Sequence, residues 1–200
     1  HMVSHTWKWR GTRHSLSCQY FTATSTTQSP TPDAHLSYRD LCSPLLGRHQ
    51  LRNAAVVLET VETLRSLGIQ VSDAALRRGM HDVVWPARFE IMGQQPYFVV
   101  DGAHNVDSAH SLAETLRQYF PDIRPWFVLA ILSDKDIRAI LRQLLPWGQG
   151  AFLARTHHPR AADPRQLQDE AARYSIPAQV IESVAEATRR AIEQVGPQGL

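Results

Sequence analysis

The second half of the chain alternates short apolar runs with amphipathic segments. The apolar runs are YFVV at 97–100, WFVLAIL at 126–132, AFLA at 151–154 and AQVI at 178–181. Helical spacing of apolar residues follows at about 107–119, 136–145, 164–174 and 184–195. Asp163 before Pro164, and Ser183 three residues before Glu186, have the signatures of helix N-caps. Near-continuous apolar strands that alternate with helices predict a Rossmann-like α/β domain with a parallel sheet covered on both faces.

The first half has a different pattern. HTWKWR (5–10) and SLSCQYFTA (15–23) alternate partly and predict short strands, and TTQSPTPDA (26–34) predicts a turn or loop. Apolar residues at helical spacing between 51 and 64 predict a long helix that ends at Gly68, and a second short helix is expected from Ser72 to Gly79. A boundary is expected near 83–90, and the first half shows no obvious core of its own.

Composition and charge exclude several classes of protein. The formal net charge is +2, from 21 basic and 19 acidic residues, which gives no general attraction to nucleic acid or to an anionic membrane. No stretch approaches the length of a membrane span. Cys18 and Cys42 have no metal-like spacing and form no disulfide framework, so a reducing cytoplasm is the default compartment.

Polar side chains follow three of the four predicted strands. The first strand runs into Asp101, His104 and Asn105, the second into residues 133–136, and the third into residues 155–160. In an open parallel sheet, ligands bind beyond the carboxyl ends of the strands, so these side chains are candidates for a site. Alternatives stay open: Asp101 could accept backbone N–H bonds in a turn, and Asn105 or Asp107 could cap the next helix.

A metal site at this edge is a further alternative. Asp101, His104, Asp134 and His157 are ligand types that suit a divalent ion. No tight His-x-His or His-Glu-x-x-His spacing supports it, and loop positions for His157 and His158 are the simpler interpretation.

Five short motifs occur in one order along the chain. They are GRHQLRNAA (47–55), WPARFE (85–90), VVDGAHN (99–105), LSDKD (132–136) and HPRA (158–161). Together they resemble the folylpolyglutamate synthase and dihydrofolate synthase family of the Mur ligase superfamily, across about residues 36–165. The resemblance implies that residues 1–84 are the C-terminal portion of a Mur-type central ATPase domain. Residues 85–200 would then be the Rossmann-like C-terminal domain, itself truncated.

The resemblance also implies a reaction. ATP would phosphorylate a carboxylate of folate or dihydropteroate, and the amine of glutamate would attack the acyl phosphate to form an amide. Mg²⁺ would neutralise the phosphates. A related Mur-type ligase acting on a cell-wall precursor, or a non-catalytic binding module on the same fold, remains an alternative.

Roles for individual residues follow from the same resemblance. Asn53 would hydrogen-bond the adenine edge, with less certain roles for the neighbouring His49 and Gln50. Arg88 would hold phosphate, and Asp101 would accept from ribose hydroxyls. His104, the proposed catalytic residue, would lie near the terminal phosphate and the incoming glutamate, with Lys135 as a supporting positive charge.

The chain departs from the family pattern in three ways. Ala87 stands where glycine is usual, and Val106 stands where proline is usual. A P-loop needs Gly-Lys, but the two lysines, Lys8 and Lys135, do not follow a glycine, so the sequence contains no Walker A motif. We therefore expect a fragment cut at both ends, with the magnesium ligands mainly outside it and with no ligase turnover by the chain alone.

Overall fold

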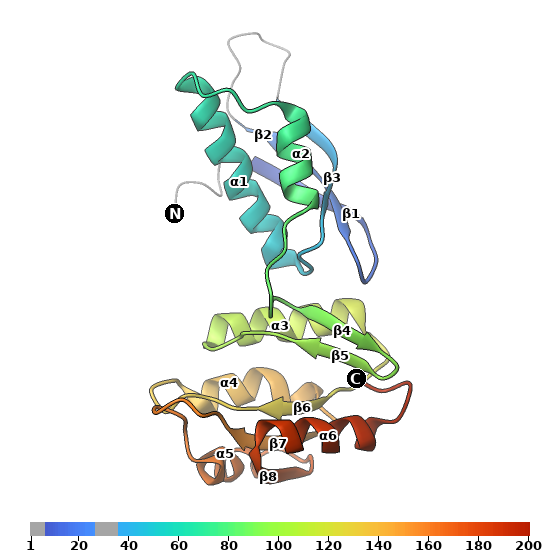
Figure 1. The fold of residues 1–200 in the computed structure, drawn as a ribbon, viewed down its shortest axis with the longest axis vertical. Coiled ribbons are helices and arrows are strands. Elements are labelled where there is room, and N and C mark those ends of the chain that lie inside the picture. The colour runs from blue at the N-terminus through green and yellow to red at the C-terminus, as the bar shows by residue number, and fades with distance from the viewer. Residues whose placement is uncertain (1–6, 27–35) are drawn as a thin grey trace. The chain divides into compact units, whose positions relative to one another are not determined.

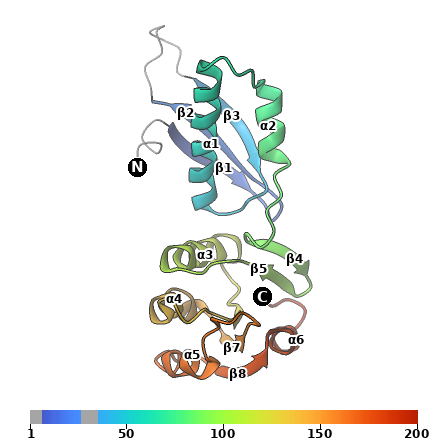
Figure 2. The same ribbon diagram turned by 60° about the vertical axis from the view of Figure 1, so that its left-hand side comes forward.

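A computed structural model describes residues 7–26 and 36–200, and the expected turn at 26–34 lies almost wholly outside this range. The chain divides into two compact units, His1–Arg88 and Phe89–Leu200. Figures 1 and 2 show the elements of each unit, and each is described by itself below.

Unit 1 is an antiparallel three-stranded sheet with two helices on one face. The strands are β1 (Trp7–His14), β2 (Gln19–Ser25) and β3 (Ser37–Ser43), in the order β1-β2-β3, and the helices are α1 (Arg48–Ser66) and α2 (Asp73–His81). The two predicted helices are confirmed, with Ser72 as the N-cap of α2 through its bond to the Ala75 N–H. β3 was not predicted.

The expectation that this half lacks its own core is wrong. β2 buries Phe21 and Ala23, β3 buries Tyr38 and Leu41, and α1 packs Leu58 against them. β3 was missed because Tyr38 and Leu41 are three residues apart, which breaks the period of two that marks a strand. A register shift opposite Phe21 and Ala23 and a positive φ of 54° at Asp40 accommodate the extra residue.

The cysteines form a bond that the sequence did not predict. Cys18 and Cys42 are joined by a disulfide with a Cα–Cα distance of 6.3 Å. The pairing of β2 with β3 places Tyr20 opposite Cys42 and so brings the two cysteines together. Their separation of 24 residues in the sequence does not predict the disulfide, because the strand register sets the distance between the two cysteines.

Unit 2 contains the predicted parallel sheet. Its elements are β4 (Glu90–Gln94), β5 (Tyr97–Val100), α3 (Val106–Tyr119), β6 (Trp126–Leu129), α4 (Ile137–Leu144), a 3-10 turn (Leu145–Trp147), β7 (Gly150–Arg155), α5 (Pro164–Ala171), β8 (Ala178–Ser183) and α6 (Val184–Val195). The order β6-β7-β8 is parallel throughout, which confirms the α/β class. α6 covers one face, where Phe152 and Ala154 pack on Ala187 and Ala191.

One part of the sheet prediction is wrong. YFVV forms a strand, β5, but it pairs antiparallel with β4 in a separate two-stranded sheet and not with β6. β4 was missed because EIMGQ is short, contains Gly93 and ends at a tight turn through Gln95-Pro96. Asp163 and Ser183 cap α5 and α6 as predicted. No helix in the described part of the chain is long and apolar enough to cross a membrane.

Candidate functional site

Unit 1 contains a pocket of about 570 Å³ beside α1, α2 and the segment that follows α2. Asn53 and Arg88, which the sequence placed in a common site, both line it, together with His49 and Gln50. The His-Gln-x-x-Asn spacing puts Gln50 and Asn53 one helical turn apart on α1, so their side chains meet on one face. This pocket therefore gathers the unit 1 candidates.

The amides at the α1 end of this pocket form a short ordered chain. Asn53 Nδ2 donates to Gln50 Oε1 at 3.1 Å, and Gln50 Nε2 lies 3.0 Å from His49 Nε2. Because the Gln50 amide nitrogen can only donate, His49 Nε2 accepts. Within the described residues Asn53 Oδ1 and the second Asn53 N–H have no protein partner, so the Asn53 amide can still accept one bond and donate another.

Arg88 and an apolar wall complete the pocket. Val57, Val61 and Met80 supply apolar surface, and Trp85, 58% exposed, lies with its ring centroid 5.7 Å from the Arg88 guanidinium carbon. No carboxylate pairs with Arg88 among the residues the structure describes. The sequence did not reveal the apolar wall, although Val57 is an apolar residue on the outer face of an amphipathic helix, which was an available signal.

The backbone beside Arg88 is strained. Ala87 has a φ of 56°, in the left-handed region that favours glycine. Ala87 therefore adopts the backbone conformation expected of the family's glycine, although its Cβ makes that conformation less favourable.

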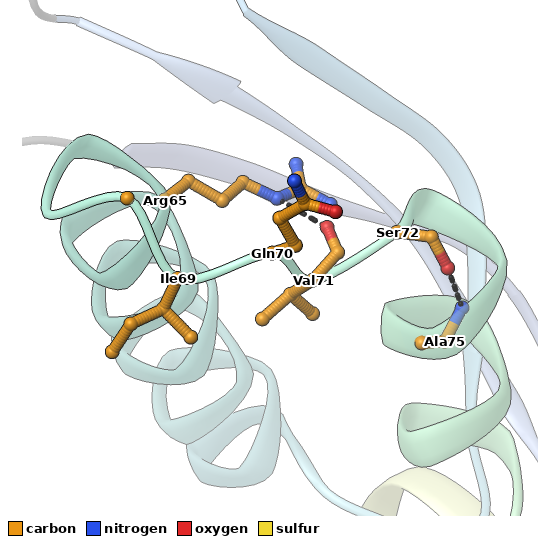
Figure 3. A pocket seen from close by; sticks show the side chains of 7 residues that line it. Arg65, Ile69, Gln70, Val71, Ser72 and Ala75 are labelled. Atoms are coloured by element: carbon orange, nitrogen blue, oxygen red, sulfur yellow. Dashed lines mark hydrogen bonds between the residues drawn. The ribbon is translucent and has the colours of Figure 1, made fainter.

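A second hollow in unit 1 lies beside a set of hydrogen bonds and ion pairs that its own lining residues make. It measures about 720 Å³ and lies at the α1–α2 connection, lined by Arg65, Val71 and Ser72 among others (Figure 3). Arg65 donates to the Val71 carbonyl at 2.7 Å and pairs with Glu62 and Asp73 at 2.8 and 2.9 Å. Ser72 accepts from the Ala75 N–H. These bonds hold the connection together, and we assign no ligand to it.

In unit 2, Asp101 accepts backbone N–H hydrogen bonds, as the alternative of a turn predicted. Its Oδ2 accepts from the Phe89 N–H and its Oδ1 accepts from the Ala103 N–H, both at 2.8 Å. The half-buried carboxylate therefore fixes the loop after β5 to the start of β4. The role of Asp101 towards ribose hydroxyls stays a prediction.

His104 and Asn105 follow in the same loop. His104 Nδ1 lies 2.9 Å from the Gly102 carbonyl, which can only accept, so Nδ1 carries the proton and Nε2 is the unprotonated nitrogen of the neutral ring. Asn105 caps α3 in a reciprocal box with Ser108, which confirms the capping alternative for Asn105. α3 starts at Val106, so the helix forms here without the proline of the family pattern.

Lys135 lies in the loop after β6. Its Nζ is 3.7 Å from Asp134 Oδ2, which also accepts from Arg160 Nη1 at 2.6 Å. The Ser133 N–H donates to the Arg160 carbonyl, so the loops after β6 and β7 lie together. In the described residues no group of three or more His, Cys, Asp or Glu could hold a metal, so Asp101, His104, Asp134 and His157 do not form the metal site considered as an alternative.

Known proteins match both the sequence and this architecture. Residues 87–200, more than half of the chain, match the family model of the Mur ligase glutamate ligase domain. The chain belongs to the Mur ligase family. It is 35% identical, over 133 residues, to the dihydrofolate synthase/folylpolyglutamate synthase of Bacillus subtilis, a match that covers 66% of this chain and 31% of the relative. The resemblance found in the sequence is confirmed.

Two solved structures extend the match of this Mur ligase chain. Folylpolyglutamate synthase of Mycobacterium tuberculosis, complexed with ADP and AMPPCP, superposes with a TM-score of 0.78 at 29% identity, covering 94% of this chain and 41% of that one. A bifunctional folylpolyglutamate synthase/dihydrofolate synthase with Mn, AMPPNP and L-glutamate bound gives a TM-score of 0.74 at 25% identity, with 96% and 41% covered. The chain thus spans about a third of the curated relative and two fifths of the solved chains.

Proposed function

We propose that this chain is part of an ATP-dependent ligase that adds glutamate to folate or dihydropteroate through an acyl phosphate. Residues 1–84 would belong to the central ATPase domain and residues 85–200 to the glutamate ligase domain. The observation that carries the proposal is the unit 1 pocket, where an amide with two unused hydrogen-bonding groups lies at one end of an apolar cavity that Arg88 also lines. The names of the similar proteins support the choice of substrates.

The pocket chemistry suits adenine. Asn53 can accept from the exocyclic amino group and donate to a ring nitrogen, while Gln50 holds its amide in place. Val57, Val61 and Met80 would contact the faces of the purine. Arg88 offers a planar fork of donors that matches phosphate, and it makes no competing ion pair in the described part of the chain.

The unit 2 residues would act by position and charge. His104, with Nδ1 held by the Gly102 carbonyl, would present Nε2 to the terminal phosphate and the incoming glutamate. Lys135 would add positive charge, and Asp101 would hold the loop and accept from the ribose. A bound Mg²⁺ would neutralise phosphate charge, and we assign its ligands to no described residue of this chain. Without a Walker A motif, we expect the chain alone to form no amide product from ATP, folate and glutamate.

A titration of the chain with adenosine and with ADP, followed by backbone amide NMR, tests the proposal. Asn53→Ala should weaken both ligands about tenfold, because one or two hydrogen bonds are lost. Arg88→Ala should weaken ADP about tenfold and leave adenosine unchanged, because only ADP carries phosphate. Arg52→Ala, an exposed arginine of α1 that does not line the pocket, is the matched control. Equal affinities in all three variants would contradict the proposal.

The resemblance also leads us to propose a cytoplasmic location. The Cys18–Cys42 disulfide weighs against it, because disulfides are rare in that compartment. Alkylation of the protein in intact cells, followed by mass spectrometry, distinguishes the two: free thiols at both cysteines would support the cytoplasm.

A further inference from the structure

The Cys18–Cys42 disulfide lies at the end of the β2–β3 ladder. Gln19 and Ser43 are the last paired residues of this ladder, and each cysteine directly precedes one of them. Ser43 also lines the unit 1 pocket, together with Asn53. The disulfide therefore closes the ladder at the point where β3 leaves the sheet and approaches the pocket.

The side chains of this last pair hold the connection from β3 to α1 (Figure 2). Gln19, 2% exposed, donates from Nε2 to the carbonyls of Leu45 and Gly47 at 2.5 and 3.0 Å. The Ser43 hydroxyl accepts from the Leu45 N–H at 3.3 Å. The connection consists of residues 44–47 alone, so these three hydrogen bonds fix most of it.

The same connection begins the helix that carries Asn53. The Gly47 carbonyl accepts from the Gln50 N–H at 3.0 Å as well as from Gln19, so one oxygen joins β2 to the first turn of α1. The Gln50 side chain in turn accepts from the Asn53 amide. Consecutive hydrogen bonds therefore run from the end of the ladder to the polar end of the pocket.

The rest of unit 1 has a core that does not involve the disulfide. Phe21 and Leu41 pair across β2 and β3, are 0% and 1% exposed, and share a core cluster with Leu58 of α1. Apolar burial of this kind is the dominant favourable contribution to folding. We therefore expect loss of the disulfide to loosen the ladder end and residues 44–47, and to leave the rest of unit 1 folded.

We propose that the Cys18–Cys42 disulfide is a redox switch, which orders the α1 end of the unit 1 pocket when oxidised and releases it when reduced. A dithiol supplies two electrons and two protons: the S–S bond breaks, both cysteines become thiols, and the dithiol closes to its own disulfide. Cys42 is half-buried, which leaves one side of the bond open to a small reductant. Transient, redox-sensing disulfides are the usual kind in a reducing compartment, so the switch is compatible with the cytoplasmic location proposed above.

Hydrogen exchange of the whole chain, without ligand, tests the structural step. Reduction with dithiothreitol should speed exchange at the Leu45 and Gln50 amides by about tenfold or more, because their hydrogen bonds depend on the ladder end. Exchange at the Leu58 and Met80 amides, in the helices of the core, should change by less than about twofold. No change at Leu45 and Gln50, or an equal change at all four amides, would overturn the proposal.

Two variants serve as controls for this experiment. The double variant Cys18→Ala and Cys42→Ala should exchange like the reduced chain and should not respond to dithiothreitol. Gln19→Leu keeps both cysteines but removes the donor to the Gly47 carbonyl, so reduction should change exchange at the Gln50 amide by less than about twofold. A tenfold response in Gln19→Leu would overturn the assignment of Gln19 as the residue that connects the disulfide to α1.

A second measurement connects the switch to ligand binding, and this part rests on the proposed function. Adenosine should bind the oxidised chain about tenfold more tightly than the reduced chain, because only the oxidised chain holds Gln50 and Asn53 in place. Saturating adenosine must then make the disulfide harder to reduce by the same factor, measured as the fraction of free thiols in a dithiothreitol titration.

The outcomes distinguish this inference from the proposed function. Equal adenosine affinity of the oxidised and reduced chains would overturn the switch and leave the nucleotide pocket intact. Absence of adenosine binding to both forms would count against the nucleotide pocket alone, because a difference in exchange at Leu45 and Gln50 would still support the switch.

Discussion

The two groups of candidate residues use their polar atoms in opposite ways. In the unit 1 pocket, Asn53 keeps an acceptor and a donor unused, and Arg88 makes no ion pair among the described residues. In the loop after β5, Asp101 and Asn105 already accept backbone N–H groups at their own site. Unmade hydrogen bonds at a cavity are available to a ligand, whereas made ones stabilise the fold. Polar residues of one motif set can therefore differ in how much of their hydrogen-bonding capacity the fold itself uses.

The largest expected effect is a loss of stability in unit 2 on substitution of Asp101. Asp101→Ala removes the acceptor of two backbone N–H groups, and hydrogen bonds to a charged group contribute about 1.5–3 kcal/mol each. We expect the free energy of unfolding of unit 2 to fall by about 3 kcal/mol. Hydrogen exchange of the β4 and β5 amides at increasing urea concentrations measures this loss of stability. Asp107→Ala, an exposed acid in the first turn of α3, should cost less than about 1 kcal/mol, and an equal loss in both variants would contradict the contrast.

The second largest effect on stability is expected at Tyr38, a buried polar residue of unit 1 that stabilises the fold and does not line the pocket. Burial, together with a hydrogen bond to Glu62, raises the pKa of Tyr38 from 10.0 to about 12. A raised pKa in the folded state means that this stabilisation is complete below pH 10 and is lost as the pH rises through about 12.

Unit 1 should therefore lose up to about 2 kcal/mol of stability across that interval. Denaturant unfolding at several alkaline pH values, monitored at α1 amides, measures the loss. Tyr38→Phe should be less stable at neutral pH but should show a smaller loss in the same interval, and an unaltered slope in this variant would exclude Tyr38 as the cause.

A smaller effect is expected at the cap of α3. Asn105→Ala removes the bond to the Ser108 N–H and should lower the stability of unit 2 by about 1 kcal/mol. Asn105→Ser keeps a capping oxygen and should recover most of the loss. Thermal unfolding of the three chains makes the comparison, and a Ser variant no better than the Ala variant would show that Asn105 does not act as a cap.

Ala87→Gly should increase the stability of unit 1, whereas the substitutions above decrease stability. Ala87 adopts a φ of 56°, which glycine tolerates without a Cβ clash, so the substitution should raise the stability of unit 1 by about 0.5–1 kcal/mol. Ala74→Gly, in the first turn of α2 at an ordinary helical position, should lower it by about 0.5 kcal/mol. Urea midpoints of the two variants give the sign, and a loss at residue 87 would show that the left-handed conformation is not maintained in solution.

The smallest effect on stability is expected at the open side chain of the pocket. Arg88→Ala removes no ion pair within the described chain, so the free energy of unfolding of unit 1 should change by less than about 0.5 kcal/mol. The same variant should lose ADP affinity, as proposed above. A large loss of stability would place Arg88 with Asp101, among residues that hold the fold.

Much of the fold was predictable because local signals agreed with the final structure. The helices α1 to α6 and the strands β5 to β8 follow from apolar periodicity, and Ser72, Asp163 and Ser183 cap helices as their spacing indicates. The strands β3 and β4 were missed because register shifts and Gly93 break the alternation. Asn53 and Arg88 were found by motif and lie in one pocket, but the motif gave no information about the apolar residues between them.

The sequence by itself determined the α/β class of residues 89–200, the family, and the identity of the polar candidates, because these depend on periodicity and on short motifs that local chemistry constrains. Only the tertiary structure decided that Cys18 and Cys42 form a disulfide and that β5 pairs with β4 outside the parallel sheet. It also decided that the Asp101 carboxylate accepts hydrogen bonds from the Phe89 and Ala103 N–H groups. Each of these depends on which strands pair and in what register. Register is set by the packing of residues far apart in the chain, which no local pattern records.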